Sequence, residues 1–367
     1  MSRIVAMKAY GYDWSNIHGL TMVEAAGTMA SHGVDWALIQ NQIDPLPGSA
    51  VDQQPPDGAY SDKGFRDALG ERGIVVYEST SVFFDPESFA ADPSLRPIDQ
   101  HGQVFEPSGW YVGVCPSDRK YLARKAERIS EVVDRLRPDG IFLSFIRFPG
   151  FWELWMPETA RSDIAEYCFC DRCLDRFAQE TGHSERRPEV LLGQLRPEWT
   201  AWKCGVIAEA AAVLRAAARD VDPGIKVLLN GFGLGTDDFG NAVEEVLAQR
   251  FGDLDASIDH YELMFYFQIQ RRDPATWIPR RIADARARTN RTLLACLQAG
   301  AEYLEPEYAS GNRAREITDA DWVAALRASA DADGVAVYSW RDLLANPARV
   351  AALLDYKVSP RTTWRPV

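Results

Sequence analysis

The chain has 367 residues, a length that fits either two domains or one α/β barrel of roughly 250 residues with insertions. Its composition is 46% hydrophobic and 25% charged, which is typical of a folded globular protein and not of a disordered one. The formal net charge of −13 argues against nucleic acid as a partner, because phosphate binding needs clustered lysine and arginine.

Eight short apolar segments, rich in β-branched and aromatic residues, predict β-strands. They are residues 4–10, 36–43, 74–81, 140–147, 225–231, 261–268, 292–298 and 335–340. Helical stretches lie between them, and those at 21–32, 62–72 and 118–137 have recognisable start or stop residues. Alternation of strands with helices predicts parallel pairing, and eight such units predict an α/β fold closed into a (β/α)8 TIM barrel.

The alternative is a doubly wound open sheet, which requires a phosphate-binding glycine turn after the first strand. Residues 11–14, Gly-Tyr-Asp-Trp, are not such a turn. We therefore expect a single barrel domain over residues 1–358, without an internal repeat, and an irregular tail at 359–367. Three long strand-to-helix connections would lie on the C-terminal face, where barrel enzymes build their active sites: residues 44–61, 83–117 and 148–199.

The sequence also predicts where the protein works. No apolar run approaches the roughly 18 residues of a membrane span, so we expect no membrane partner. Lys8 interrupts the apolar stretch near the N-terminus, which is therefore not a signal-peptide core. A cytoplasmic location is the expectation that follows, and in that reducing compartment the six cysteines indicate metal binding more than disulfides.

The most specific local feature is a cluster of cysteines. Cys168, Cys170 and Cys173 place three thiols within six residues, and a turn would let them converge on one tetrahedral ion. Cys115 is the best candidate for a fourth ligand, because its loop would share the same barrel face. The pattern predicts a structural Zn²⁺ site that braces loops and performs no chemistry, since four thiolates leave no open position. No organic cofactor is expected.

These cysteines carry a family resemblance. Cys-Pro-Ser at 115–117, followed by Cys-Phe-Cys-Asp-Arg-Cys at 168–173, resembles the zinc-binding pattern of family 42 glycoside hydrolases, the β-galactosidases. Residues 139–149, Asp-Gly-Ile-Phe-Leu-Ser-Phe-Ile-Arg-Phe-Pro, resemble strand four of several uncharacterised barrel glycosyl hydrolases. The resemblance covers residues 110–180 and implies a glycosidase with a small carbohydrate substrate. Because family 42 enzymes are often oligomers, it leaves a homo-oligomer open.

One part of the family pattern is missing. Family 42 enzymes have an Asn-Glu pair at the end of strand four, and its glutamate is the acid/base. This chain has Ser144-Phe145 or Arg147-Phe148 at that place. The catalytic residues must therefore be sought among the other carboxylates.

Glycoside hydrolysis usually needs two carboxyl groups, which in a barrel lie near the C-terminal ends of strands. Glu153 follows the fourth strand among aromatic residues that would exclude water, as suits a general acid. Glu78 lies late in the third strand, where a carboxylate is costly unless it is paired or used. Glu302 follows the seventh strand, where related barrels hold a nucleophile. We expect Glu153 to be the acid and Glu78 or Glu302 its catalytic partner; a solvated loop charge or a buried ion pair is the alternative for each.

Other residues near the predicted strand ends are candidates for binding substrate. Arg147 would hold a carboxylate in place or bind a substrate anion, Trp340 would either stack on a sugar ring or pack in the protein, and Asp238 would either bind substrate or cap a helix. The full set is Arg147, Asp238, Tyr266, Gln268, Gln298, Trp340 and Arg341. Glu262 is expected deeper in the barrel, neutralised by Lys8 from the first strand.

Two other functions remain open at this point. One is a sugar isomerase or lyase that uses a divalent metal held by Glu78, Asp237 and Glu262. The other is a carbohydrate-binding barrel without catalytic activity, which the missing Asn-Glu pair motivates. Serine hydrolases and P-loop enzymes are disfavoured, because the chain has neither motif.

Overall fold

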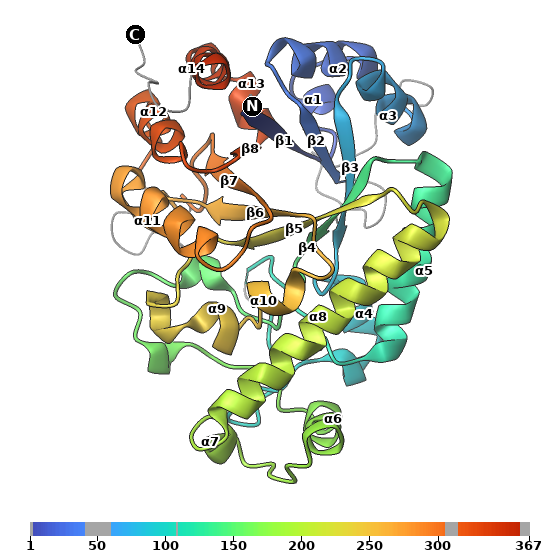
Figure 1. Ribbon diagram of the computed structural model, residues 1–367, viewed down its shortest axis with the longest axis vertical. Helices are drawn as coiled ribbons and strands as arrows, with labels where there is room; N and C mark the ends of the chain where they lie inside the picture. The colour runs from blue at the N-terminus through green and yellow to red at the C-terminus, as the bar shows by residue number, and fades with distance from the viewer. Residues whose placement is uncertain (1–2, 41–59, 108, 305–314, 360–367) are drawn as a thin grey trace.

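Eight parallel strands form a closed barrel in a computed structural model of the chain (Figure 1). The structure describes residues 3–40, 60–107, 109–304 and 315–359. The strands are β1 (Ile4–Tyr10), β2 (Trp36–Gln40), β3 (Val75–Ser81), β4 (Gly140–Ser144), β5 (Lys226–Phe232), β6 (His260–Phe265), β7 (Thr292–Gln298) and β8 (Gly334–Tyr338). Each strand pairs with the next and β8 pairs with β1, so the predicted (β/α)8 barrel is confirmed.

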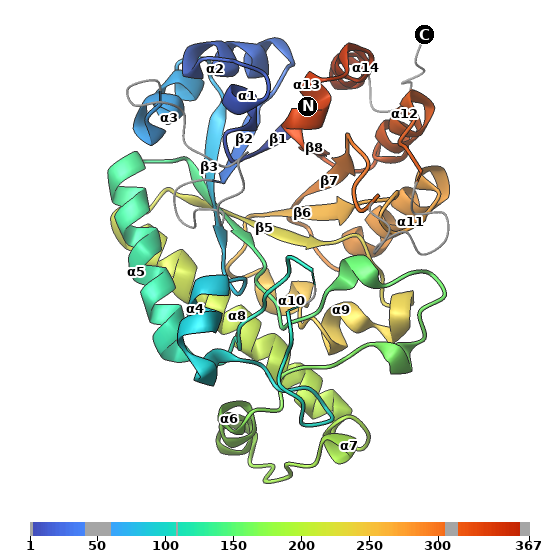
Figure 2. The ribbon, with the colours of Figure 1, turned by 180° about the vertical axis from the view of Figure 1, so that it is seen from behind.

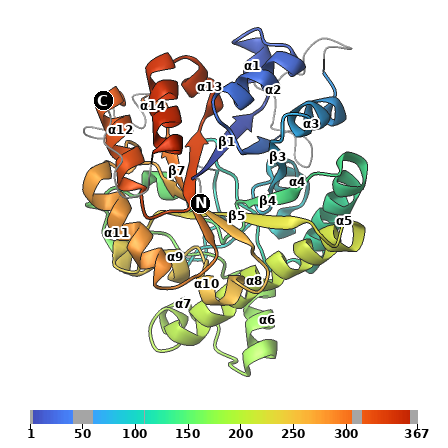
Figure 3. The same cartoon turned by 45° about the horizontal axis from the view of Figure 1, so that its top comes forward.

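Helices surround the strands on all sides (Figure 3). The α-helices are α1 (Asp13–Asn16), α2 (Met22–Ser31), α3 (Asp62–Gly70), α4 (Pro86–Ala91), α5 (Arg119–Leu136), α6 (Asp171–Thr181), α7 (Pro188–Leu191), α8 (Arg196–Val221), α9 (Ala242–Glu245), α10 (Phe251–Leu254), α11 (Pro274–Arg286), α12 (Asp319–Ala328), α13 (Trp340–Leu344) and α14 (Pro347–Val358). Short 3-10 turns are η2 (Pro93–Leu95), η3 (Trp152–Leu154), η4 (Arg161–Asp163) and η5 (Asp238–Gly240). Within the described ranges, none of the helices has the length and apolarity that crossing a membrane requires.

The predicted element bounds agree closely with the observed ones, with two informative exceptions. β4 stops at Ser144, three residues before the predicted end, because Phe145 takes a left-handed backbone conformation with φ of 51° that ends the extended strand. β6 stops at Phe265 and the chain turns at residues 266–272. The end of the predicted strand 36–43, most of the loop 44–61 and residues 360–367 of the tail lie outside the described residues.

Local sequence signals start the helices where they were expected. Thr21 accepts a hydrogen bond from the backbone N–H of Glu24, and the Glu24 carboxylate accepts one from the N–H of Thr21, so α2 begins with a complete capping box. The Asp118 carboxylate caps α5 by accepting from the N–H of Tyr121 over 2.8 Å. These caps satisfy backbone donors that have no partner inside the helix.

Four repeated aspartate hydrogen bonds, which the sequence did not predict and which we call the aspartate lock, join neighbouring strands at the N-terminal end of the barrel. An aspartate stands immediately before each even-numbered strand, and its carboxylate accepts a hydrogen bond from a backbone N–H in the preceding odd-numbered strand. The four bonds, 2.8 to 2.9 Å long, join Asp35 to Val5, Asp139 to Val76, Asp259 to Val227 and Asp333 to Leu293. The barrel thus repeats in units of two strands, although the intervening segments differ too much in length to show this in the sequence.

The long connections after β3 and β4 run beside each other at the opposite end of the barrel (Figure 2). Asp99 pairs with Tyr167 in an antiparallel bridge, and the N–H of Phe169 donates to the carbonyl of Ile98 over 2.8 Å. α6 and α7 belong to the second connection and project beyond the barrel at the end of α8 (Figure 1). Two loops distant in sequence therefore form one substructure at the face where barrel enzymes bind substrate.

The aspartate lock can be tested by removing one carboxylate. Asp139→Ala should lower the free energy of unfolding by about 1–3 kcal/mol, because the N–H of Val76 would be left without its partner. Asp331→Ala, which removes an exposed aspartate from the turn before β8, should change it by less than about 0.5 kcal/mol. Urea unfolding monitored by circular dichroism measures both. Equal losses in the two variants would contradict the role of the lock.

Candidate active site

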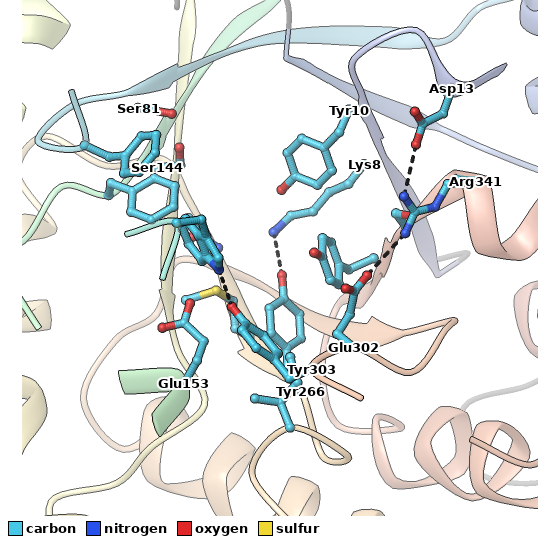
Figure 4. Close-up of a pocket in the computed structure, with 18 residues that line it drawn as sticks. Lys8, Tyr10, Asp13, Ser81, Ser144, Glu153, Tyr266, Glu302, Tyr303 and Arg341 are labelled. Atoms are coloured by element: carbon cyan, nitrogen blue, oxygen red, sulfur yellow. Dashed lines mark hydrogen bonds and ion pairs between the residues drawn. The ribbon is translucent and has the colours of Figure 1, made fainter. Parts of the chain in front are cut away.

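A cavity of about 550 Å³ lies at the C-terminal end of the barrel strands (Figure 4). The last residues of four strands line it: Tyr10 of β1, Ser81 of β3, Ser144 of β4 and Tyr338 of β8. This is the face on which the sequence placed the long connections, and it is the face where barrel enzymes hold their substrates.

A buried ion pair lies next to the cavity, and its lysine lines the cavity. Lys8 of β1 and Glu262 of β6 meet across the barrel, with Nζ 2.9 Å from Oε1, and both side chains are shielded from solvent. Lys8 also donates to the hydroxyl of Tyr266 over 3.2 Å, and Asn230 donates to the Glu262 carboxylate. Burial alone would lower the pKa of Lys8, but Cys296 and Glu262 raise it above its ordinary value, so the ammonium stays charged. The predicted deep neutralisation of Glu262 by Lys8 is confirmed.

One wall of the cavity carries charged and phenolic groups. The Arg341 guanidinium lies between two carboxylates, 3.3 Å from Glu302 and 3.5 Å from Asp13 (Figure 4). Burial raises the pKa of Tyr10 to about 12 and that of Tyr338 well above its ordinary value, so these phenols remain protonated hydrogen-bond donors. This wall can therefore bind several hydroxyl groups of a ligand.

The other wall is aromatic. Phe84 and Trp110 from the connection after β3, Phe145 after β4 and Tyr303 after β7 line it. The rings of Phe84 and Phe145 lie 5.0 Å apart, and the indole N–H of Trp110 donates to the hydroxyl of Tyr303 over 2.8 Å. Three connections thus meet to form one apolar surface, of the kind on which a sugar ring can stack.

Glu153 enters the cavity from the 3-10 turn η3. The neighbouring Trp152 is buried, with its ring 5.5 Å from that of Phe232 and 5.9 Å from that of Tyr266. Glu153 itself is 6% exposed and lines the cavity. The packing of Trp152 therefore fixes the turn that carries this carboxylate.

Glu302 and Glu153 come together in one cavity, whereas Glu78 does not join them. By strand alternation Glu78 faces away from the barrel interior, opposite to Ser79 and Ser81. The charges that act on it belong to Asp62 and Arg66 on α3 and to Arg135 on α5. Among the described residues, those that line the cavity do not include Glu78. The prediction that Glu78 is a catalytic partner is therefore wrong.

The seven predicted substrate-binding residues divide in a similar way. Tyr266 and Arg341 line the cavity, and the other five do not line it within the described part of the chain: Arg147, Asp238, Gln268, Gln298 and Trp340. Trp340 is 1% exposed in α13 and cannot serve as a stacking platform, and the neighbouring Tyr338 and Ser339 reach the cavity instead.

Two of these residues are held by other side chains. Arg147 is enclosed by the rings of Tyr111, Phe145 and Phe232, each 5.1 to 5.2 Å from its guanidinium carbon. Asp238 accepts a hydrogen bond from the Gly235 N–H and pairs with Arg272 and Arg281. Its side chain caps neither η5 nor α9, so the structure supports neither of the two expected roles.

Sequence reasoning named no binding role for Ser81, Ser144 or Tyr338, although each is the last residue of its strand and lines the cavity. That position was the available signal. Successive residues of a barrel strand face alternately inward and outward. A final residue on the inward-facing side therefore points into the barrel at its C-terminal end, whichever amino acid it is.

The predicted cysteine cluster is formed at the meeting point of the two long connections. Cys115, Cys168, Cys170 and Cys173 are buried, and their sulfur atoms lie within 4.8 Å of one another. The Sγ of Cys115 is 3.7 Å from that of Cys170 and 3.5 Å from that of Cys173. Hydrogen bonds from the three neighbouring thiols lower the pKa of Cys115, so a thiolate is favoured there. These four residues are close enough to bind a metal ion.

The three carboxylates expected to bind a catalytic metal are not brought together. Glu78 lies outside the barrel interior, Asp237 pairs with Arg280 and Arg281, and Glu262 pairs with Lys8. In the part of the chain that the structure describes, the cysteine cluster is the one group of three or more metal-binding side chains that converges. The ligand set predicted for an isomerase or lyase is therefore wrong.

Comparisons with known proteins support the fold. No protein-family model and no curated protein sequence matches the chain. A β-galactosidase from Halorubrum lacusprofundi has a TM-score of 0.66 at 14% identity, over 97% of this chain and 58% of that one. The family 42 β-galactosidase Gan42B from G. stearothermophilus has a TM-score of 0.63 at 10% identity, over 97% and 56%. The glycoside hydrolase domain of PgaB (BpsB) from Bordetella bronchiseptica has a TM-score of 0.65 at 15% identity, over 97% and 99%.

The likeness is one of fold. This chain spans less than three fifths of the length of the two β-galactosidases and nearly all of the PgaB domain. The shared architecture agrees with the resemblance found in the sequence around the cysteines. It leaves the reaction to be argued from the cavity itself.

The buried Glu78 makes stability depend on pH. Burial raises the pKa of Glu78 from its ordinary 4.5 to about 8. Between these pH values the unfolded chain has released a proton that the folded protein retains, so stability should fall as the pH rises towards about 8 and then level off. Glu78→Gln should remove this decline and stabilise the protein at pH 9 by a few kcal/mol. Urea unfolding of both proteins at pH 5 and pH 9 measures the effect, and parallel pH profiles would contradict it.

Proposed function

We propose that this protein is a glycoside hydrolase that cleaves a small glycoside or oligosaccharide. The observation that carries the proposal is the placement of Glu153 and Glu302, from the segments after β4 and β7, in one cavity with an aromatic wall. Glycoside hydrolysis needs two such carboxyl groups, one that donates a proton and one that is ionised. The aromatic wall suits the apolar face of a sugar ring, and the opposite wall suits its hydroxyls.

The two carboxyl groups differ in surroundings, which suggests their roles. Glu153 has little access to water and is suited to hold a proton and pass it to the leaving-group oxygen. Glu302 lies beside the Arg341 guanidinium, which favours a carboxylate that attacks the anomeric carbon or activates water. Retention would require the two groups to be about 5–5.5 Å apart, and inversion about 6.5–9.5 Å.

The fold supports this proposal by analogy. Two of the similar structures are β-galactosidases and one is a glycoside hydrolase domain, so barrels of this shape carry such chemistry. The proposed general acid, Glu153, occupies a different position from the acid/base glutamate of the family 42 pattern. Glu153 stands on a 3-10 turn beyond β4, and the end of the strand itself holds Ser144.

The catalytic pair can be tested with p-nitrophenyl glycosides of common monosaccharides. Glu153→Gln and Glu302→Gln should each lower kcat on a substrate of the wild type by about 100-fold or more, because each removes a group that acts in the transition state. Glu189→Gln, an exposed glutamate in the same connection, is the matched control and should retain activity. The melting temperatures of all three should stay close to that of the wild type.

Two outcomes would contradict the catalytic assignment. Activity that survives either catalytic substitution would remove that residue from the pair. Glycan binding by the wild type and by both variants, with no turnover of any substrate, would favour the non-catalytic carbohydrate-binding barrel.

We further propose that the cysteine cluster binds a structural Zn²⁺. Zinc–sulfur bonds of about 2.3 Å in a tetrahedron place the sulfur atoms about 3.8 Å apart, close to the separations from Cys115 to Cys170 and Cys173. The Ile98 N–H donates to the Cys168 sulfur over 3.4 Å, and the Ser117 hydroxyl lies 3.1 Å from the Cys173 sulfur. Such contacts suit sulfur ligands that carry negative charge. Four thiolates leave no position for substrate, so the metal would hold the two connections together.

Metal removal should therefore destabilise the two connections that line the cavity, although the metal would not contact the carboxylates. We expect about one zinc per chain by inductively coupled plasma mass spectrometry, and a large fall in melting temperature after chelation or in Cys173→Ser. Cys204→Ser, which alters a buried cysteine outside the cluster, should keep the metal. A purified protein that lacks zinc, or a Cys173→Ser variant that keeps it, would contradict the assignment.

A further inference from the structure

The turn after β6, residues 266–272, lies between the two segments that carry the proposed catalytic carboxylates. Ile269 at its centre lines the cavity, while its neighbours Gln268 and Gln270 are 2% and 0% exposed. Neither glutamine lines the cavity within the described part of the chain, so contact with substrate does not explain them. Each contacts a different carboxylate-bearing segment.

Gln268 contacts both backbone groups of Glu302. Its side-chain carbonyl accepts a hydrogen bond from the Glu302 N–H over 3.1 Å, and its amide donates to the Glu302 carbonyl over 3.1 Å. A carboxamide is the side-chain group that offers a donor and an acceptor side by side without charge. Gln268 therefore fixes the position of this one residue in the loop after β7.

Gln298, the last residue of β7, fixes Gln268 in turn. Its carbonyl accepts hydrogen bonds from the backbone N–H groups of Gln268 and Ile269, over 3.1 and 3.3 Å. Its amide donates to the side-chain carbonyl of Gln268 over 3.3 Å and to the carbonyl of Gly300 over 3.4 Å. The turn after β6 and the loop after β7 are thereby joined by buried amide groups of defined orientation.

Gln270 contacts the other segment. Its amide donates to the carbonyl of Trp152 over 3.1 Å, and Trp152 immediately precedes Glu153. Because the Trp152 ring also packs against Tyr266, the turn after β6 holds this segment by its backbone and by its side chain. Two glutamines two residues apart thus hold the chain at Glu302 and next to Glu153.

We propose that Gln268 and Gln270 are positioning residues that set the separation between Glu153 and Glu302. This inference rests on the proposed function, in which these carboxylates are the catalytic pair. Neither carboxylate stands on a strand, so the rigid barrel does not itself fix the distance between them. The distance is set instead by one short turn that hydrogen-bonds to both segments, and that distance decides between retention and inversion.

The chemistry of the two positions supports a positioning role. A glutamate at 268 would face the Glu302 carbonyl with a second acceptor, and a glutamate at 270 could not donate to the Trp152 carbonyl when ionised. Methionine has a similar length and no hydrogen-bonding groups of comparable strength, so Gln→Met removes the contacts while it fills the space. A displacement of about 1 Å at a catalytic group is enough to lower the rate about 100-fold.

The experiment compares Gln268→Met and Gln270→Met with Gln249→Met. Gln249 is a matched control, since it is also buried and donates to two backbone carbonyls, those of Ile146 and Asn230, over 3.1 and 3.3 Å. Crystal structures of the wild type and the three variants give the distance between the Glu153 and Glu302 carboxyl carbons. Kinetics use dinitrophenyl and phenyl glycosides of a sugar that the wild type hydrolyses, and melting temperatures measure the loss of stability.

The two positions should give different kinetic signatures. Gln270→Met displaces the general acid, so turnover of the phenyl glycoside, whose leaving group needs a proton, should fall about tenfold or more beyond that of the dinitrophenyl glycoside. Gln268→Met displaces the partner carboxylate, so kcat should fall about tenfold or more on both substrates while KM changes little. Gln249→Met should lose comparable stability but keep its kcat and the wild-type distance.

An unchanged carboxyl distance in both test variants would overturn the positioning role. So would a loss of kcat in the control as large as in the test variants. These results are separate from a failure of the proposed function, which would show as activity retained in Glu153→Gln or Glu302→Gln. If the wild type hydrolyses no glycoside, the crystallographic distances still decide whether the turn sets the separation.

Discussion

Closure of eight parallel strands into a ring imposes the constraint on which the rest of the structure depends. In a closed barrel, alternate residues of every strand face either the shared interior or the surrounding helices, and no other direction exists. Glu78 and Glu262 are both buried carboxylates on strands, yet the first faces helices α3 and α5 and the second meets Lys8 in the interior. Strand parity thus separates a carboxylate that faces the surrounding helices from one that pairs with Lys8, a residue that lines the cavity.

The fold could be predicted from the sequence because its signals are local and repeated. Short apolar segments and glycine or aspartate boundaries mark the strands and helices, and such signals need no knowledge of distant contacts. The exceptions depend on tertiary structure. The left-handed conformation of Phe145 that ends β4 and the aspartate lock between neighbouring strands arise only when the loops pack and the strands pair.

The site was predicted less completely, for a physical reason. Proximity to a strand end located Glu153 and Glu302, since any residue there lies near the C-terminal face. It did not give the direction of a side chain once the strand had ended, and Trp340 turned into the packing of α13 rather than into the cavity. Gln268 and Gln298 are expected to bind substrate because strand alternation and a strand end place them at the pocket. β6 ends at Phe265, however, and both amides bond to backbone groups instead.

The loops that line the cavity are joined to one another by buried side chains. The connection after β3 supplies Phe84 and Trp110, the connection after β4 supplies Glu153, and the cysteine cluster draws its four members from these two connections. The loop after β7, which carries Glu302, is joined to them through the buried glutamines of the turn after β6. The cysteine cluster and the glutamine contacts both matter, because loops, unlike strands, have no regular backbone pairing to hold them. A cavity whose carboxylates stand on loops needs side-chain contacts to position them, and the buried amides of Gln268 and Gln270 contact both of these loops.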